Sequence, residues 1–364
     1  MPQMTNYILP AEWYPQSAIQ LTWPHEGTDW APYLEEIIHT YVELAREITR
    51  NERLIIATED PEIVKQRLAG ELPMKQMRRV SFCQCPIDDT WARDHGALTL
   101  LPMTGNYLNQ KEKGSQAINL KFTFNGWGGK YPSTNDNNIA HHLFAEGHLA
   151  KQMEDHEDFE LEGGAIESDG RGTIMTTSLC LLKRNQPHTI EQIEEELKHR
   201  LRAKRVIWIH HGQLSGDDTD GHIDTIVRMA PYNTLLYTRC DDPNDEHYAD
   251  FKALEQELKA LRTAEGRLYK LLPLPLPDPI FEVDGHRLPA TYANFLIINE
   301  GVLIPTYNQP AKDKAAAEMI SKAFPHRKPL PIDARTIIRQ HGSLHCSTMQ
   351  FPENALNSVE ITHK

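Results

Sequence analysis

Short β-like runs, gathered in clusters that helical or polar segments separate, constrain the fold of this chain more than any other feature. Examples are RLIIAT at 53–58, ALTLL at 97–101 and RVIWIHH at 205–211. Alternation of strands and helices usually indicates parallel layers. The stretch NFLIINEGVLIPTY at 294–307, however, has the pattern of a hairpin, which requires antiparallel pairing. We therefore expect an α/β fold of repeated units in which strands of both orientations are combined with a helix.

Helices are predicted between these strand clusters. In PYLEEIIHTYVELAREITRN apolar side chains recur at helical spacing, so one face of this segment should cover a core. Asp60–Pro61 has the form of an N-cap followed by proline at the first helical position. Thr189 and Gln192 can form a capping box. The predicted helices are residues 32–51, one beginning at Asp60–Pro61, one beginning at Thr189, and residues 248–262 and 311–323.

No segment of the chain has the composition of a long linker or a low-complexity tract. The proline-rich LLPLPLPDP at 271–279 is a candidate hinge, although such a piece is more often an extended surface connection. The length of 364 residues is compatible with two ordinary domains or one large one. We predict one domain over residues 1–364.

Charge and cysteine content limit the possible functions of the protein and its possible cellular compartments. The net charge of −13 disfavours nucleic acid as a partner and favours a small cation. No apolar run is long enough to span a membrane, and the first residues lack the pattern of a secretory signal, so we expect a cytoplasmic protein without a membrane partner. The five cysteines are odd in number and lack paired metal-type spacing, which fits a reducing compartment. Cys83 and Cys85 share one face of a predicted strand, where core packing is their expected role.

Two acidic stretches can bind a cation beside a histidine. In LSGDDTDGHIDTIVRM at 214–229, an extended HID segment would point His222 and Asp224 to one face. In DDTWARDHGALTL at 88–100, Asp94 lies just ahead of an apolar strand and close to Trp91. A carboxylate and an aromatic face together suit a bound cation. The alternatives are a solvated acidic turn in the first stretch and a plain N-cap or salt bridge in the second.

A third stretch, LEGGAIESDGRGTIMTT at 161–177, places Glu162 before a pair of glycines. Paired glycines permit a close backbone approach or a positive φ angle, which is common at sites and also in ordinary turns. The pattern then predicts a strand, a DGRG turn and a second strand.

The stretch GSLHCSTMQFP at 342–352 contains Cys346. A strand there would put Leu344, Cys346 and Thr348 on one face. A lone cysteine is most often a small buried hydrophobe. A nucleophilic cysteine needs a thiolate, which an imidazolium such as that of His222 or a cationic substrate can stabilise. Two aspartates that bind a planar guanidinium, with a thiol and a histidine on opposite sides of its carbon, would form a hydrolytic site.

The motifs WARDHG, LEGGAIESDG, GDDTDGHID and GSLHCSTMQFP, in this order, resemble those of the agmatine deiminase and bacterial peptidylarginine-deiminase-like family of guanidino-group-modifying enzymes. WPHEGTDW at 23–30 and FNGWGGKYPSTNDNN at 124–138 are similar to further family motifs, so that the resemblance covers about residues 20 to 352. It implies a five-bladed α/β propeller (pentein fold) of ββαβ-type units with a central active site. It also implies hydrolysis of agmatine to N-carbamoylputrescine and ammonia, in putrescine biosynthesis.

The resemblance assigns a role to individual residues. Cys346 would be the nucleophile, His222 the general acid and base, Asp94 and Asp224 the guanidinium ligands, and Glu162 the residue that orients His222. The substrate-binding residues would be Asp218, Trp91, Trp127 and Tyr131. Asp218 takes a position that is usually glutamate in the agmatine enzymes and is thought there to hold the distal amine. No metal or organic cofactor is implied, and a homodimer is compatible with the family.

Other functions remain open at this stage. Peptidyl-arginine or free arginine could be the substrate of the same cysteine, histidine and aspartate mechanism. The histidine pairs at 141–142 and 210–211, with the carboxylates, could instead form the site of a metal-dependent hydrolase, although no helical ligand spacing links them. A non-catalytic binding module on the same scaffold is the third alternative. The presence of Cys346, His222 and the carboxylates favours the enzyme.

Overall fold

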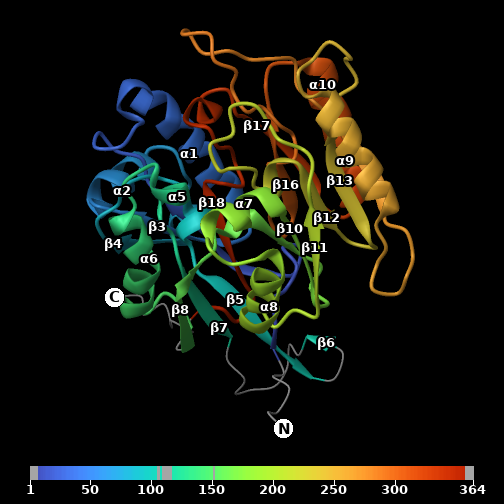
Figure 1. The fold of residues 1–364 in the computed structure, drawn as a ribbon. Coiled ribbons are helices and arrows are strands. Elements are labelled where there is room, and N and C mark those ends of the chain that lie inside the picture. The colour runs from blue at the N-terminus through green and yellow to red at the C-terminus, as the bar shows by residue number, and fades with distance from the viewer. Residues whose placement is uncertain (1–6, 105–106, 109–116, 151, 357–364) are drawn as a thin grey trace.

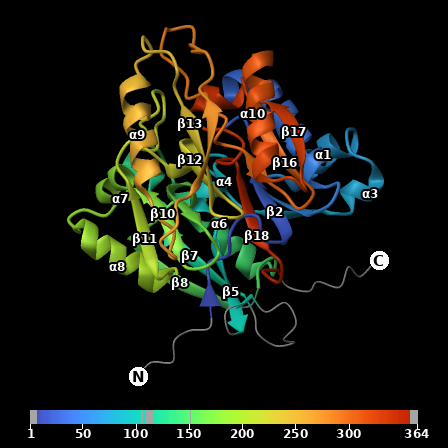
Figure 2. The ribbon, with the colours of Figure 1, turned by 90° about the vertical axis from the view of Figure 1, so that its right-hand side faces the viewer.

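The computed structural model describes residues 7–104, 107–108, 117–150 and 152–356, which form five small mixed sheets with helices between their strands (Figure 1). Helices α8 (Ile190–Arg200), α9 (Tyr248–Ala260) and α10 (Pro310–Ala323) lie at the outside of the molecule (Figure 2). The expectation of a mixed α/β protein built from repeated units is confirmed at this level.

Three of the sheets repeat one pattern. In each, two successive strands pair antiparallel, one or two helices follow, and a third strand returns parallel to the second. The hairpin predicted at 294–307 is the antiparallel pair of the third unit. The elements are β9 (Ile166–Ser168), β10 (Thr173–Thr177), α7 (Ser178–Arg184), α8 (Ile190–Arg200) and β11 (Arg205–Ile209); β12 (Val227–Ala230), β13 (Thr234–Arg239), α9 (Tyr248–Ala260) and β14 (Lys270–Pro275); and β15 (Leu296–Ile297), β16 (Gly301–Thr306), α10 (Pro310–Ala323) and β17 (Lys328–Asp333).

The other two sheets extend the same pattern. One has the order β1-β5-β7-β8 with β6 beside β5, and the other has the order β18-β2-β3-β4. In the second, β18 from the end of the chain pairs antiparallel with β2 from its beginning, so that distant parts of the chain complete one sheet. The elements are β1 (Tyr7–Ile8), β5 (Leu98–Thr104), β6 (Tyr107–Leu108), β7 (Ile118–Thr123), α6 (Thr134–Ala145) and β8 (Gln152–Glu160); and β18 (Thr348–Pro352), β2 (Gln16–Thr22), α1 (Leu34–Ile48), β3 (Arg53–Thr58), α2 (Pro61–Ala69), α3 (Met74–Met77) and β4 (Val80–Gln84).

Short helical turns precede one strand in each of three sheets. The turn α4 lies ahead of β5, η2 ahead of β9 and η3 ahead of β12. These turns contact one another, because α4 packs on η2 and η2 packs on η3. Residues just ahead of different sheets are therefore brought together at one place. The short turns are η1 (Ala31–Tyr33), α4 (Ala92–His95), α5 (Gly126–Gly129), η2 (Gly163–Ala165), η3 (Ile223–Thr225) and η4 (Ile337–Gln340).

The predicted helices are confirmed, with small differences at their ends. The predicted face of α1 is buried, and the Asp60 side chain accepts hydrogen bonds from the backbone N–H groups of Glu62 and Ile63. Thr189 and Gln192 form the capping box at the start of α8. Capping satisfies N–H groups that have no partner inside a helix, which is why these starts could be read from local sequence.

Two strand predictions at candidate site residues are wrong. Residues 344–347 form turns, with Ser347 N donating to Ser343 O, and strand β18 begins only at Thr348. His222 precedes the 3-10 turn η3 and is not in a strand. In both places a local turn hydrogen bond replaces the ladder bond of a strand. The predicted alternation of Leu344, Cys346 and Thr348 therefore does not apply.

The proline-rich stretch at 271–279 is neither a hinge nor a simple connection. Its first part is strand β14, which lies at the edge of its sheet and pairs in parallel with β13. Proline is tolerated on an edge strand, because an edge strand has no neighbour on its outer side that would need the missing N–H group as a hydrogen-bond donor. Cys83 and Cys85 are both buried, as core packing requires.

Across the described residues, no helix has the combination of length and apolar character that crossing a bilayer requires.

Candidate active site

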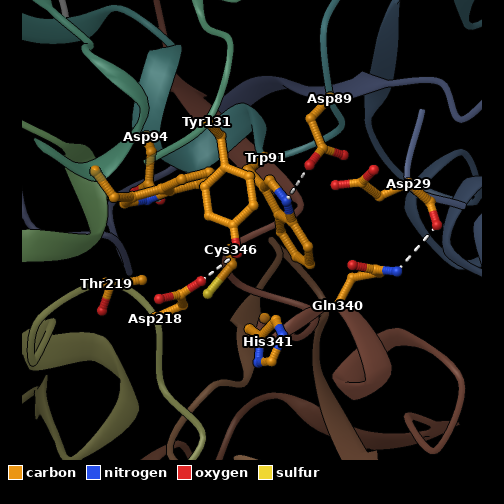
Figure 3. Close-up of a pocket in the computed structure, with 12 residues that line it drawn as sticks. Asp29, Asp89, Trp91, Asp94, Tyr131, Asp218, Thr219, Gln340, His341 and Cys346 are labelled. Carbon is orange, nitrogen blue, oxygen red and sulfur yellow. Dashed lines mark hydrogen bonds between the residues drawn. The ribbon is translucent and has the colours of Figure 1, made fainter. Parts of the chain in front are cut away.

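One pocket collects most of the residues singled out from the sequence (Figure 3). Asp29 and Asp89 lie on the Trp91 side of this pocket, and Asp218 lies on the other side with Tyr131 (Figure 3). His222, Asp224 and Glu162 are buried directly behind its inner end. The lining residues are Asp29, Asp89, Trp91, Asp94, Trp127, Tyr131, Asp218, Thr219, Gln340, His341, Gly342 and Cys346.

Cys346 lies at the inner end of the pocket, in the turn that precedes β18. Its Sγ is 3.1 Å from Asn294 Nδ2, which donates to it, and 3.7 Å from Asp224 Oδ2. Burial raises the pKa of the thiol well above its usual value, and Asp224 and Asp94 raise it further. Without a substrate, the site therefore favours the neutral thiol. A cation placed between the carboxylates would reverse this preference.

Sequence reasoning did not single out Asn294 as a site residue, although its position in the chain could have indicated it. It is buried just ahead of β15, the first strand of its sheet. Asp94, Glu162 and Cys346 hold the equivalent position ahead of β5, β9 and β18. Position ahead of the first strand of each cluster would have identified the asparagine as a candidate.

His222 is held from behind by Glu162. Its Nε2 lies 3.1 Å from Glu162 Oε2, and Arg184 Nε donates to Glu162 Oε1 at 2.6 Å. Its Nδ1 lies 3.7 Å from Asp94 Oδ1 and has no hydrogen-bond partner among the described residues. Burial opposes a charge on His222, but Asp94, Cys180 and Glu162 outweigh it and raise the pKa well above the usual value. The ring is therefore an imidazolium whose free N–H can serve the pocket.

Asp94 is fixed by two donors. Trp127 Nε1 donates to Oδ2 at 2.9 Å, and the backbone N–H of Gly164 donates to Oδ1 at 3.1 Å. Burial raises the pKa of Asp94 to about 6, although His222 partly offsets this. A Cβ at Gly164 would come within 2.6 Å of His222 Nδ1 and 2.9 Å of Asp94 Oδ1, so only glycine fits there. The pair of glycines thus allows the backbone to pass close to the side chains of His222 and Asp94.

Asp224 is the second carboxylate near the thiol. His345 Nδ1 lies 2.6 Å from its Oδ2, whereas its Oδ1 is buried and has no partner among the described residues. Burial opposes the charge, but His345 and His222 lower the pKa of Asp224 below its usual value. The site therefore holds an ionised carboxylate whose Oδ2 lies near Cys346 and whose Oδ1 has no partner among the described residues. Such an oxygen can accept a hydrogen bond from a guanidinium N–H.

A buried ionic network supports Asp224. His345 Nε2 lies 2.7 Å from Glu12 Oε1, and Glu12 also accepts from Arg93 and Arg228. Arg228 in turn contacts Glu167 and lies over the Phe295 ring at 4.4 Å. Sequence reasoning missed this network, because its members come from distant parts of the chain and share no motif.

The outer part of the pocket is aromatic and acidic. Trp91 Nε1 donates to Asp89 Oδ2 at 2.9 Å, and the Tyr131 hydroxyl donates to Asp218 Oδ2. Lys130 Nζ lies 3.3 Å from Asp218 Oδ1. Burial opposes the charge of Asp218, but Tyr131 and Lys130 lower its pKa. Asp218 is thus ionised, with part of its charge already balanced.

Three groups of side chains in the described residues could in principle hold a metal ion. Two lie at the core of the site, and each contains a carboxylate that is already paired with arginine: Glu162 with Arg184, and Glu12 and Glu167 with Arg228. The third lies elsewhere and includes Cys83. The histidines at 141–142 and 210–211 are in none of the three groups and do not line the pocket.

Comparisons with known proteins return deiminases of peptidyl-arginine, arginine and agmatine. A family model of the Porphyromonas-type peptidyl-arginine deiminases matches residues 8–352. A structure from Porphyromonas gingivalis with the provisional name arginine deiminase is 44% identical, covers 96% of this chain and 99% of its own, and has a TM-score of 0.87. A variant agmatine deiminase of C. jejuni, determined with substrate bound, is 36% identical with a TM-score of 0.84, over 95% of this chain and 96% of its own. An agmatine deiminase of Stutzerimonas stutzeri is 30% identical over 96% of this chain and 97% of its own.

Proposed function

Because the chain belongs to the Porphyromonas-type peptidyl-arginine deiminase family of guanidino-modifying hydrolases, we propose that it hydrolyses agmatine to N-carbamoylputrescine and ammonia through Cys346. One observation carries the proposal. The Cys346 thiol lies beside Asp224 at the inner end of a pocket that Asp94 also lines, and His222 Nδ1 lies directly behind that end, 3.7 Å from Asp94 Oδ1. A planar cation bound by both aspartates would lie with its carbon between the sulfur and the imidazolium.

The first half of the reaction begins when the guanidinium enters. Its positive charge offsets the two aspartates that raise the thiol pKa, so Cys346 loses its proton to solvent and becomes a thiolate. The thiolate adds to the guanidinium carbon and gives a neutral tetrahedral adduct. The His222 imidazolium donates a proton to one amino group, which departs as ammonia and leaves a positively charged thiouronium on Cys346.

The second half uses the now neutral His222 as a base. It takes a proton from water, and the hydroxide adds to the thiouronium carbon to give a neutral tetrahedral adduct. The added hydroxyl then loses its proton to solvent as the C–S bond breaks, which releases the neutral ureido product and the thiolate. Glu162, held by Arg184, keeps the ring oriented through both halves. Asp94 and Asp224 contribute positioning and charge compensation. These steps require no metal or organic cofactor.

The lining of the pocket supports agmatine as the substrate. Asp29, Asp89 and Asp218 surround its outer part, and among the described lining residues there is neither lysine nor arginine. Lys130 is nearby but is paired with Asp218 and Asp220. The distal amine of agmatine would therefore meet carboxylates, and Trp91, Trp127 and Tyr131 would flank the aliphatic spacer. The α-carboxylate of free arginine would meet no cation there.

Peptidyl-arginine and free arginine remain the second candidates. They are favoured by the family model and by the provisional name of the P. gingivalis relative, which is the more similar of the two structures described above.

We also propose that the five sheets are the blades of a propeller and that residues 1–364 form its single domain. Residues at the site come from positions just ahead of one strand in each of the five sheets, namely β5, β9, β12, β15 and β18: Asp94, Glu162, Asp224, Asn294 and Cys346. Fivefold repetition around a common centre accounts for this convergence.

The deciding experiment is ammonia release from the purified protein with agmatine, free arginine and a blocked arginine peptide in parallel, with EDTA present throughout. We expect activity on agmatine that EDTA does not affect and that iodoacetamide abolishes. Activity on arginine or the peptide alone would retain the mechanism and overturn the substrate. No ammonia from any of the three would overturn the proposed function.

A further inference from the structure

A group of metal-ligating side chains lies away from the active site, where the end of α6 meets strand β4. The potential ligand atoms of Cys83, Glu146 and His148 all lie within 4.8 Å of one another. Cys83 is on β4 and is buried, whereas Glu146 and His148 follow α6, the first exposed and the second partly buried. The three side chains thus form a short path from solvent to a buried thiol.

Neighbouring contacts hold these side chains close together. His148 Nε2 lies 3.1 Å from the backbone oxygen of Phe82 and 3.4 Å from Glu146 Oε2. A hydrogen bond with Cys85, burial and the Glu146 carboxylate together raise the pKa of the Cys83 thiol. In the metal-free protein Cys83 is therefore protonated.

The donor set indicates the kind of ion. Calcium and magnesium prefer oxygen ligands alone, whereas zinc accepts thiolate sulfur, imidazole nitrogen and carboxylate oxygen, and three protein ligands leave its fourth position to water. The charge balance also favours a cation. Among the ion pairs of the described residues, Glu146 is paired with His148 and with no lysine or arginine, unlike the carboxylates of the two groups at the active site.

We propose that Cys83, Glu146 and His148 form a binding site for one zinc-class divalent ion. On binding, the Cys83 thiol releases its proton to solvent and the sulfur, the neutral imidazole and the carboxylate each give an electron pair to the ion. Affinity therefore falls as the pH is lowered, because protons compete for the same ligands.

Metal binding there would support the active site through both elements. Strand β4 leads directly into the segment that carries Trp91 and Asp94. Helix α6 carries Asp136, whose Oδ1 accepts from the backbone of Asp88 at 2.7 Å and whose Oδ2 accepts from that of Asp89 at 3.0 Å. An ion that joins the end of α6 to β4 would reinforce this segment from both sides. We therefore expect zinc to raise the Tm of the protein, since a ligand that binds only the folded state stabilises it.

Cobalt(II) is the probe for the test, because thiolate ligation gives it a charge-transfer band in the near ultraviolet. We expect the full-length protein to bind one equivalent with this band, and zinc to displace it. Cys83→Ser should abolish the band, and His148→Gln should weaken binding at least about tenfold. His148→Gln changes a side chain that is only partly buried, so it keeps the test valid if Cys83→Ser fails to fold.

Three control variants separate this site from other thiols. Cys240→Ser, Cys180→Ala and Cys346→Ala should all retain the cobalt band and the zinc-dependent rise in Tm, because Cys240 belongs to another sheet and the other two belong to the active site. A band that persists in Cys83→Ser, or one that is lost in Cys346→Ala or Cys180→Ala, would overturn the proposal. So would the absence of any thiolate band in the unaltered protein.

Discussion

His345 Nδ1 lies 2.6 Å from Asp224 Oδ2, and this contact leaves the other oxygen of Asp224 as the one without a partner among the described residues. The opposite ring nitrogen of His345 lies 2.7 Å from Glu12. Each ring nitrogen of His345 therefore lies within hydrogen-bond distance of a carboxylate oxygen, which fixes the ring between Asp224 and Glu12. His345 thus orients Asp224 toward Cys346 and prevents rotation of the carboxylate.

His345→Gln should therefore lower kcat/KM with little loss of folded protein. An amide can make one of the two contacts but not both, so Asp224 loses part of its orientation. Displacement of a substrate ligand by about 1 Å can cost roughly a hundredfold in rate, and we expect a loss of about ten- to a hundredfold. Steady-state kinetics with agmatine measures it. His39→Gln, a change at an exposed position, is the control, and equal kinetics of the two variants would contradict the role of His345.

Cys346→Ser should reduce turnover by at least about a thousandfold while the circular dichroism spectrum stays unchanged. The hydroxyl is a far weaker acid than the thiol, so the bound guanidinium cannot convert it into an oxyanion near neutral pH. Cys240→Ser should keep full activity. Appreciable turnover by Cys346→Ser would overturn the assignment of the Cys346 thiolate as the nucleophile.

Glu162→Gln should move the basic limb of the pH profile of kcat to lower pH. The charge on Glu162 is one of the contributions that raise the pKa of His222 against the effect of burial. Without it, the imidazolium that protonates the departing ammonia is lost at a lower pH. Glu191→Gln, at an exposed position, should leave the profile unchanged. A basic limb that stays in place would remove Glu162 from this role.

Asp218→Asn should raise KM for agmatine about tenfold or more and leave KM for butylguanidine, which lacks the distal amine, nearly unchanged. The ionised Asp218 lines the outer pocket, so its charge should act on the amine and not on the guanidinium. The two substrates are compared by ammonia release under the same conditions. Equal changes for both would show that Asp218 acts on the pocket as a whole, and no change for either would assign the amine to other carboxylates.

Glu52→Gln should stabilise the protein at pH 8 by about 1–3 kcal/mol and have little effect at pH 4. Burial raises the pKa of Glu52 to about 7, and its Oε2 has no partner among the described residues. The protonated form stabilises the fold below the unfolded pKa near 4.5, and this contribution is lost as the pH rises toward 7. Urea unfolding at both pH values measures the difference. The exposed Glu59→Gln is the control, and a stability gap that does not widen with pH would contradict the buried acid.

Much of the local structure could be predicted from short segments. The start of α8 follows from Thr189 and Gln192, and the hairpin of β15 and β16 follows from its apolar pattern, because both depend on contacts between near neighbours in sequence. The strand predicted through Cys346 is wrong because the structure there also depends on contacts with residues that are distant in sequence. The turn at Ser343–Ser347 has an apolar and polar alternation that suits a strand, but hydrogen bonds with Asn294 and Arg93, which are distant in sequence, add to the local bond of the turn.

The sequence by itself identified the residue types that can perform the chemistry, since Cys346, His222, Asp94, Asp224 and Glu162 each lie in a short motif. Only the tertiary structure decided which atoms of these residues are free. Asn294 donates to the thiol from another sheet, and His345 meets Glu12 although 333 positions separate them in the chain. Such contacts depend on how the ends of the chain come together in one sheet, and their electrostatic effects depend on burial. Neither quantity is encoded in the neighbours of a single residue.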